Sequence, residues 1–185
     1  MIITLTGKPC SGKGTVGKLF CEKYNFEYLS TGQIFRELSA KHNYKSVLEF
    51  QQKHKNIKDV DKLVDSKTVE IGKTRLNDNI IFDSRLAWHF IPKSFKVFLD
   101  IDWFTAGERL VKAEREEENV ETLEEAIEVL KARWNEENAR YLSLYNVDNT
   151  DMSKYDLVIF SADKSPEEIV EIIYKEYKKF MKNLK

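Results

Sequence analysis

Short apolar runs alternate along the chain with longer segments in which apolar residues recur at helical spacing. The runs are rich in β-branched and aromatic residues, which is typical of buried strands. We place the strands at residues 2–6, 26–29, 79–83, 94–100 and 156–160. Because they alternate with helical segments, the pattern predicts an α/β fold with a five-stranded parallel sheet flanked by helices. The chain has no internal repeat and no linker, so we expect a single domain.

The helical segments differ in how much apolar surface they offer to a core. Helices are predicted at residues 13–23, 102–118, 122–145 and 166 onward. A further helix after residues 30–32 would carry Ile34, Phe35 and Leu38, and residues 41–72 predict two more polar helices that connect near residues 55–59. We expect this polar insert to contribute less core than the strands that flank it and to move. The predicted core stripe of helix 122–145 includes Leu130 and Trp134, and helix 102–118 is expected to use Phe104, Leu110 and Val111.

The last helix has the clearest start signal. Ser165 is the expected cap, Pro166 occupies the first helical position, and Glu168 completes a capping box.

Composition narrows the class of protein. The chain has 185 residues, of which 42% are hydrophobic and 33% charged, as in a globular domain. It has neither an apolar run of the roughly 20 residues that a membrane helix needs nor a leader pattern, and Cys10 and Cys21 lack metal-ligand spacing. We therefore expect a cytoplasmic protein with reduced thiols. Separately, we expect the protein to be a monomer. A formal net charge of −1 gives no global field for nucleic acid, so a phosphate-bearing partner must be held by local cations.

The most specific motif directly follows the first strand. Gly7, four further residues, Gly12 and Lys13 have the spacing of a phosphate-binding loop that leads into a helix. Glycines let backbone N–H groups approach phosphate oxygens, the helix N-terminus adds positive potential, and Lys13 can reach the terminal phosphates. The expected contacts are Gly7, Pro9, Cys10, Ser11, Gly12, Lys13, Gly14 and Thr15.

Arginines surround this loop in the predicted order of elements. They are Arg36, Arg85, Arg109, Arg115, Arg133 and Arg140. Arg133, Glu137 and Arg140 are spaced i, i+4 and i+7, so they share one helical face. Any one arginine could be a surface ion pair, but the set fits phosphoryl transfer, which needs cations around the charge that spreads between two phosphates. Because ligands of parallel sheets bind at the carboxyl ends of strands, residues 7–15, 30–32, 83–85 and 161–162 should converge on one cleft.

These motifs together resemble the cytidylate kinases, closest to the compact archaeal-type enzymes among the nucleoside monophosphate kinases. The resemblance covers nearly the whole chain: the Gly-Lys-Gly-Thr loop, Ser30-Thr31-Gly32-Gln33-Ile34-Phe35-Arg36, Asp83-Ser84-Arg85, the charged run 109–115, Arg133-x₃-Glu137-x₂-Arg140, and residues 156–162. It implies transfer of the γ-phosphoryl group of ATP to CMP or dCMP, with Mg²⁺ as cofactor, in a P-loop kinase. It also implies a core of residues 1–30, 73–108 and 120–185, a nucleoside-monophosphate-binding insert at 31–72 and a lid at 109–119.

The resemblance also assigns roles to individual residues. Lys13, Arg109, Arg115, Arg133 and Arg140 would be catalytic, and Ser161 and Ala162 would lie beside the adenine of ATP. The acceptor would contact Ser30, Thr31, Gly32, Arg36, Asp83, Arg85 and Glu137, with Asp83 also serving Mg²⁺.

Two departures leave the acceptor base open. Bacterial-type cytidylate kinases carry an acid after the second phosphate arginine, where this chain has Leu86, and the filling Lys8-Pro9-Cys10 of the loop is unusual. The alternatives are another P-loop small-molecule kinase, similar to adenylate or shikimate kinases, and a regulatory module that binds ATP without turnover. A module that only binds ATP would not need Arg133 and Arg140 to meet charge that develops only during transfer. Their presence therefore argues against the regulatory module.

Overall fold

The computed structural model describes residues 1–34, 37, 57–113 and 120–184. Its centre is a five-stranded sheet in the order β2-β3-β1-β4-β5, and every neighbouring pair is parallel. The strands are β1 (Ile2–Gly7), β2 (Glu27–Ser30), β3 (Ile80–Asp83), β4 (Phe95–Asp100) and β5 (Leu157–Phe160). The predicted α/β fold is confirmed, and each strand begins and ends within two residues of its predicted range.

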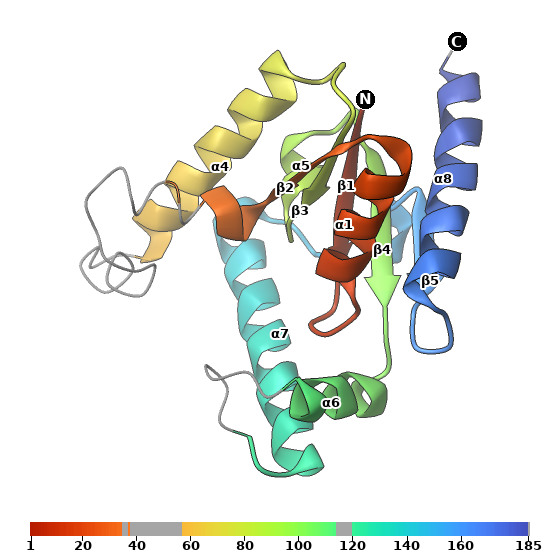
Figure 1. The fold of residues 1–185 in the computed structure, drawn as a ribbon. Coiled ribbons are helices and arrows are strands. Elements are labelled where there is room, and N and C mark those ends of the chain that lie inside the picture. The colour runs from red at the N-terminus through yellow and green to blue at the C-terminus, as the bar shows by residue number, and fades with distance from the viewer. Residues whose placement is uncertain (35–36, 38–56, 114–119, 185) are drawn as a thin grey trace.

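Helices cover both faces of the sheet (Figure 1). On one face, α1 (Lys13–Tyr24) and α8 (Pro166–Asn183) pack over alternate residues of the strands, such as Leu5 and Val97. On the other face, α4 (Ile57–Thr74) and the short α5 (Ala87–Phe90) cover β1 and β3. β1 lies at the middle of the sheet and all its residues are buried, because layers cover it on both sides.

Two further helices form a unit beyond the end of β4. α6 (Trp103–Lys112) packs against α7 (Leu123–Tyr145), and α7 then runs back along the sheet towards α4 (Figure 1). A single 3₁₀ turn, η1 (Met152–Lys154), precedes β5. Trp134 of α7 is buried beside Phe98 of β4, with ring centroids 6.3 Å apart, which fixes the middle of α7 against the sheet. Among the described residues, no helix is long and apolar enough to span a membrane.

Two predictions about packing are wrong. Phe104 and Val111 were expected in the core, but their exposed fractions are 57% and 38%. α6 instead buries the side formed by Ala106, Gly107 and Leu110. At Gly107 the two helices approach so closely that a Cβ would lie 2.8 Å from Ile127 Cγ1 of α7. The close approach of the two helices leaves the large side chains of α6 on the outer surface.

The boundaries inside the insert also differ from the expectation. The connection predicted near residues 55–59 is wrong in its second half, because α4 already begins at Ile57. Within α4, Val64, Thr68 and Ile71 are buried, whereas Leu63 is 41% exposed. Residues 114–118 of the predicted helix 102–118 lie outside the described residues, and α6 ends at Lys112.

The predicted capping box of α8 is confirmed. The Glu168 amide donates to Ser165 Oγ at 3.1 Å, and the Ser165 amide donates to Glu168 Oε2 at 2.7 Å. Thr122 and Glu125 form a second such box at the start of α7.

The box at Ser165 provides a test of how firmly α8 holds the sheet. We expect Ser165→Ala to lower the free energy of unfolding by about 1 kcal/mol, because one helix-terminal amide loses its acceptor. Ser165→Asp should stay within roughly 0.5 kcal/mol of the parent, since a carboxylate accepts the same bond. Urea unfolding followed by circular dichroism measures both, and equal losses in the two variants would contradict the capping role.

Candidate active site

The loop of residues 7–15 joins the central strand β1 to α1 and has a constrained backbone. Gly12, the residue before α1, has φ 88°, and Cys10 adopts φ 58°. Gly7 has φ 150°, and a Cβ there would overlap the carbonyl oxygen of Leu99 on β4. A glycine is therefore required at position 7 for the loop to leave β1 alongside β4.

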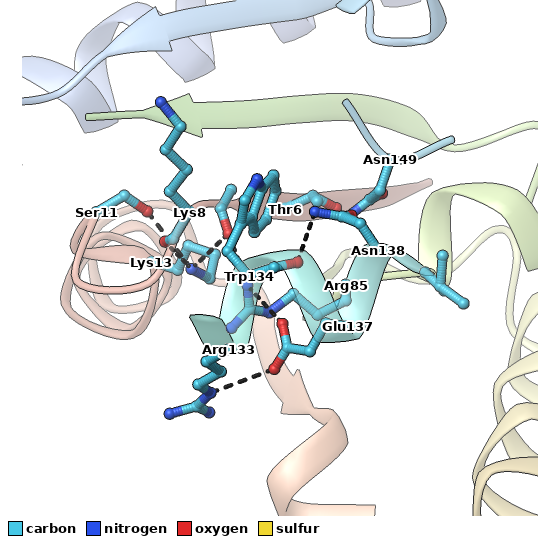
Figure 2. Close-up of polar contacts among 12 residues, drawn as sticks. Thr6, Lys8, Ser11, Lys13, Arg85, Arg133, Trp134, Glu137, Asn138 and Asn149 are labelled. Atoms are coloured by element: carbon cyan, nitrogen blue, oxygen red, sulfur yellow. Dashed lines mark hydrogen bonds and ion pairs between the residues drawn. The ribbon is translucent and has the colours of Figure 1, made fainter. Parts of the chain in front are cut away.

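Lys13 is turned into this loop. Its Nζ donates to the carbonyl oxygens of Gly7 at 3.0 Å and Lys8 at 2.7 Å, and to Ser11 Oγ at 3.4 Å (Figure 2). Burial, with a smaller contribution from the neighbouring Arg85, lowers the pKa of Lys13 to about 7, against the opposing effect of Asp83. The ammonium group thus lies where it is poorly hydrated and where a bound anion would stabilise its charged form.

Lys8 points away from Lys13 (Figure 2). Its Nζ forms an ion pair with Asp100 Oδ1 at 2.7 Å, donates to the carbonyl of Ile101 at 3.0 Å, and lies 5.1 Å from the ring centroid of Trp103. This side chain therefore ties the loop to the end of β4, which gives a structural reason for the unusual residue at position 8.

Arg85, which follows β3, and Arg133 of α7 meet on one carboxylate. Glu137 Oε2 lies 3.2 Å from Arg85 Nη1, and its Oε1 lies 3.3 Å from Arg133 Nε (Figure 2). The Arg85 guanidinium also stands 5.9 Å from the ring centroid of Trp134, and its Nη1 donates to the Gly7 carbonyl at 3.2 Å. Arg140 lies on the same face of α7, over the ring of Tyr141. The predicted shared face of these residues is confirmed.

Two cavities meet at Lys13. The larger, of about 490 Å³, is lined by Lys13, Tyr28, Ser30, Thr31, Gly32, Val64, Asp65, Asp83, Ser84, Arg85, Leu86, Arg133, Glu137, Arg140, Tyr141 and Tyr145. The smaller, of about 320 Å³, is lined by Pro9, Cys10, Gly12, Lys13, Gly14, Thr15, Asp83, Arg85, Leu130 and Arg133. Because Lys13, Asp83, Arg85 and Arg133 line both, the two spaces adjoin at a group of cations.

A third cavity lies on the other side of the loop. It has a volume of about 280 Å³ and is lined by Ser11, Gly12, Thr15, Val16, Arg109, Ser161, Lys164, Pro166 and Ile169. Arg109 donates from Nη1 to the Cys10 carbonyl at 3.2 Å and from Nη2 to the Ser161 carbonyl at 3.0 Å. Arg109 is therefore separated from the other arginines, although the sequence grouped it with them as catalytic.

Of the remaining predicted site residues, Ser30 lines the larger cavity and Ala162 lies away from all three cavities. Ser30 caps the turn 31–34 through the Gln33 amide, which donates to Ser30 Oγ at 3.1 Å. Ala162 packs against the hydrophobic cluster of α6 and α7 and lines none of the three cavities. Arg36 and Arg115 lie outside the described residues.

Oxygen atoms for a metal ion are present but few. Asp83 and the exposed Thr15 line the same 320 Å³ cavity. Within the described part of the chain, no group of three His, Cys, Asp or Glu side chains could hold a metal ion. Such a sparse set fits Mg²⁺, which commonly binds one or two carboxylates together with water and substrate phosphates.

Sequence reasoning missed Tyr28. Its hydroxyl donates to Asp83 Oδ2 at 2.7 Å, so it holds the carboxylate that faces both cavities. Its ring occupies the space beside Gly17 of α1, where a Cβ would lie 2.6 Å from Tyr28 Cε2. The glycine inside a helix was the available signal, because Gly is unfavourable there unless another group approaches closely. Asp65, Tyr141 and Tyr145 were missed as well, since they carry no motif.

The contact between Gly17 and Tyr28 can be tested by a double-mutant cycle. In a Tyr28→Ala background, Gly17→Ala should raise the free energy of unfolding by about 1 kcal/mol through helix propensity. In the parent the same change should lower it, by about 1–3 kcal/mol, because the methyl group forces the ring away. Urea unfolding of the four proteins measures the coupling, and an equal gain in both backgrounds would contradict the contact.

The chain is similar to known proteins over most of its length. A sequence profile of the cytidylate kinase-like family matches residues 2–163. A cytidylate kinase of Methanocaldococcus jannaschii is 36% identical over 179 residues, covering 94% of this chain and 95% of that protein. An S-adenosylmethionine-dependent nucleotide dehydratase of Lacinutrix mariniflava is 32% identical over 178 residues, which make up 96% of this chain but 36% of that protein.

A solved structure of shikimate kinase from Bacteroides thetaiotaomicron has a TM-score of 0.71 with this chain. The match covers 96% of this chain and 98% of that one at 16% sequence identity, so it shows a common fold. Together with the parallel sheet and the glycine loop, these matches establish that the chain belongs to the cytidylate kinase-like family and has the P-loop kinase fold.

Proposed function

We propose that the protein transfers the γ-phosphoryl group of ATP to CMP or dCMP, giving ADP and CDP or dCDP. The observation that carries this proposal is the group of cations, Lys13, Arg85 and Arg133, at the junction of two cavities. Transfer between two phosphates needs such a cluster, because negative charge spreads over the transferring group while little covalent help is required. A protein that only bound ATP would not need a second cavity on the far side of its lysine.

The donor nucleotide fits the loop and the two smaller cavities. The loop N–H groups would bind the phosphates of ATP, and the cavity beside Arg109 and Ser161 would hold its base. Asp83 and Thr15 would hold Mg²⁺ together with the phosphates, and the bound ion would neutralise charge on the transferring group. Tyr28 would orient Asp83 for this task through the hydrogen bond to Oδ2.

The acceptor fits the 490 Å³ cavity, which lies within the usual size of small-molecule sites. Arg85 and Arg140 would bind its phosphate, and Ser30, Thr31 and Gly32 would line the path to the base. Glu137 holds Arg85 and Arg133 by ion pairs, so the two guanidinium groups are already oriented before substrate binds. Arg36 and Arg115 would add charge during closure of the insert 31–72 and the lid 109–119.

The alternatives predict different acceptors. An adenylate-like enzyme would prefer AMP, and a shikimate-like enzyme would prefer a small polyol. Three tyrosines, Tyr28, Tyr141 and Tyr145, line the acceptor cavity, and such aromatic walls favour a planar base over a polyol. We also propose that the protein acts as a monomer on free nucleotides in the cytoplasm.

A panel of acceptors tests the reaction. With saturating ATP and Mg²⁺, coupled ADP release should give the highest kcat/KM for CMP or dCMP among CMP, dCMP, UMP, AMP, GMP and shikimate. Lys13→Ala should reduce turnover by at least about 100-fold, because it removes a charge from the transferring group. The matched control is Lys18→Ala, an exposed lysine further along α1, which should stay close to the parent. Turnover of Lys13→Ala within tenfold of the parent would reject the role of the loop.

The lowered pKa of Lys13 predicts that nucleotide binding takes up a proton. With a pKa of about 7, Lys13 is mostly neutral at pH 8 in the empty protein. Phosphate oxygens favour the ammonium form and raise the pKa again, so binding of ATP at pH 8 should take up close to one proton. Calorimetry in buffers of different ionisation enthalpy measures this number. Lys13→Arg, which is always charged, should show almost no uptake, and equal values for both proteins would contradict the prediction.

A further inference from the structure

The acceptor cavity has two chemically different ends. The end shared with the 320 Å³ cavity carries Lys13, Arg85 and Arg133. The residues that line the larger cavity alone include Val64 and Asp65 of α4 and Tyr141 and Tyr145 of α7, with Arg140 between Arg133 and Tyr145 along α7. Tyr145 follows Arg133 by twelve residues on the same helix, a rise of about 18 Å. A nucleotide whose phosphate meets the arginines would therefore direct its base towards the far end.

Asp65 brings a carboxylate to that far end. Tyr145 donates its hydroxyl to Asp65 Oδ2, which joins α4 to α7 across residues that are 80 positions apart. The ring of Tyr145 is itself held at 87° to the ring of Phe90, with centroids 5.4 Å apart. A carboxylate offers about four acceptor positions and no donor, so Asp65 can receive a bond from Tyr145 and a further one from a ligand.

The other carboxylates of the cavity have different tasks. Asp83 accepts from Tyr28 and also lines the cavity of the phosphate loop. Glu137 forms ion pairs with Arg85 and Arg133 at the phosphate end. Leu86, which lines the cavity beside Arg85, is apolar and cannot bond to a base edge. Asp65 is the carboxylate whose position on α4 suits the edge of a base.

We propose that Asp65 selects acceptor nucleotides whose base carries an exocyclic amino group, and that it does so by accepting a hydrogen bond from that group. The inference rests on the proposed function, because it assigns the 490 Å³ cavity to the acceptor. Cytosine presents an amino group where uracil presents a carbonyl oxygen, and a carboxylate attracts the first and repels the second. Val64, Leu86 and Tyr141 supply apolar and aromatic surface around the ring.

The placement on α4 links recognition to the position of the insert. Asp65 can reach a base only while α4 stands against α7, which is the arrangement in which Tyr145 donates to it. An acceptor with the correct base would therefore favour the closed cavity as well as occupy it.

The test compares CMP and UMP in the parent and in Asp65→Asn. The substitution keeps the size of the side chain and its acceptor for Tyr145, but its amide can donate to the carbonyl of uracil. The ratio of kcat/KM for CMP to that for UMP should fall by about 10- to 100-fold, the range expected for a hydrogen bond to a charged group. KM for ATP should be unchanged, since the donor cavities lie on the other side of Lys13.

Two control variants separate recognition from structure. Glu70→Gln removes an exposed acid from the same helix and should leave the ratio as in the parent. Tyr145→Phe removes the donor to Asp65 but keeps the carboxylate, so the ratio should stay within about threefold even if all acceptors bind more weakly. Asp65→Ser provides a second substitution should Asp65→Asn fold poorly, as judged by circular dichroism.

Equilibrium binding of CMP and UMP, measured by calorimetry in the same proteins, distinguishes the possible failures. A parent that binds CMP more tightly than UMP but transfers no phosphoryl group would reject the proposed function, while the loss of that preference in Asp65→Asn would still support the role of Asp65. Equal weakening of CMP and UMP in Asp65→Asn, with an unchanged ratio, would overturn the inference and leave a purely structural bond. A parent that binds neither nucleotide would overturn both.

Discussion

Two cations meet on one carbonyl oxygen at the centre of this protein. Lys13 Nζ and Arg85 Nη1 both donate to the oxygen of Gly7, at 3.0 and 3.2 Å. Bringing like charges together in a poorly hydrated place is unfavourable, and the lowered pKa of Lys13 is the consequence. An anion in the loop would relieve this repulsion. The site is therefore organised around an unfavourable electrostatic arrangement that a phosphate would turn into a favourable one.

The surrounding structure maintains that arrangement. Gly7 can leave β1 only by passing the backbone of Leu99, and Lys8 then fastens the loop to Asp100 and Ile101 at the end of β4. On the opposite side, Glu137 holds Arg85 against the loop while α7 is fixed by the burial of Trp134. Sheet, loop and α7 thus form a rigid frame for charge, as a preorganised site requires.

Much of this organisation could be predicted from local patterns. The strands, the loop, the capping box at Ser165 and the shared face of Arg133 and Glu137 depend on spacing alone, and the structure confirms them. Arg109 shows where such reasoning stops. It belongs to a charged run on a helix, but the packing of α6 carries it to the Ser161 side of the loop, away from Arg85. Likewise Phe104 is apolar yet exposed, since the small face of α6 makes the closer contact.

The sequence by itself therefore determined the class of fold, the phosphate loop and the helical face that carries the arginines, because each follows from the period of a single element. Only the tertiary structure decided the strand order β2-β3-β1-β4-β5 and the pairs that it creates, such as Tyr28 with Asp83 and Asp65 with Tyr145. These partners stand 55 and 80 residues apart. No local period relates them, because their proximity results from how whole elements pack against one another.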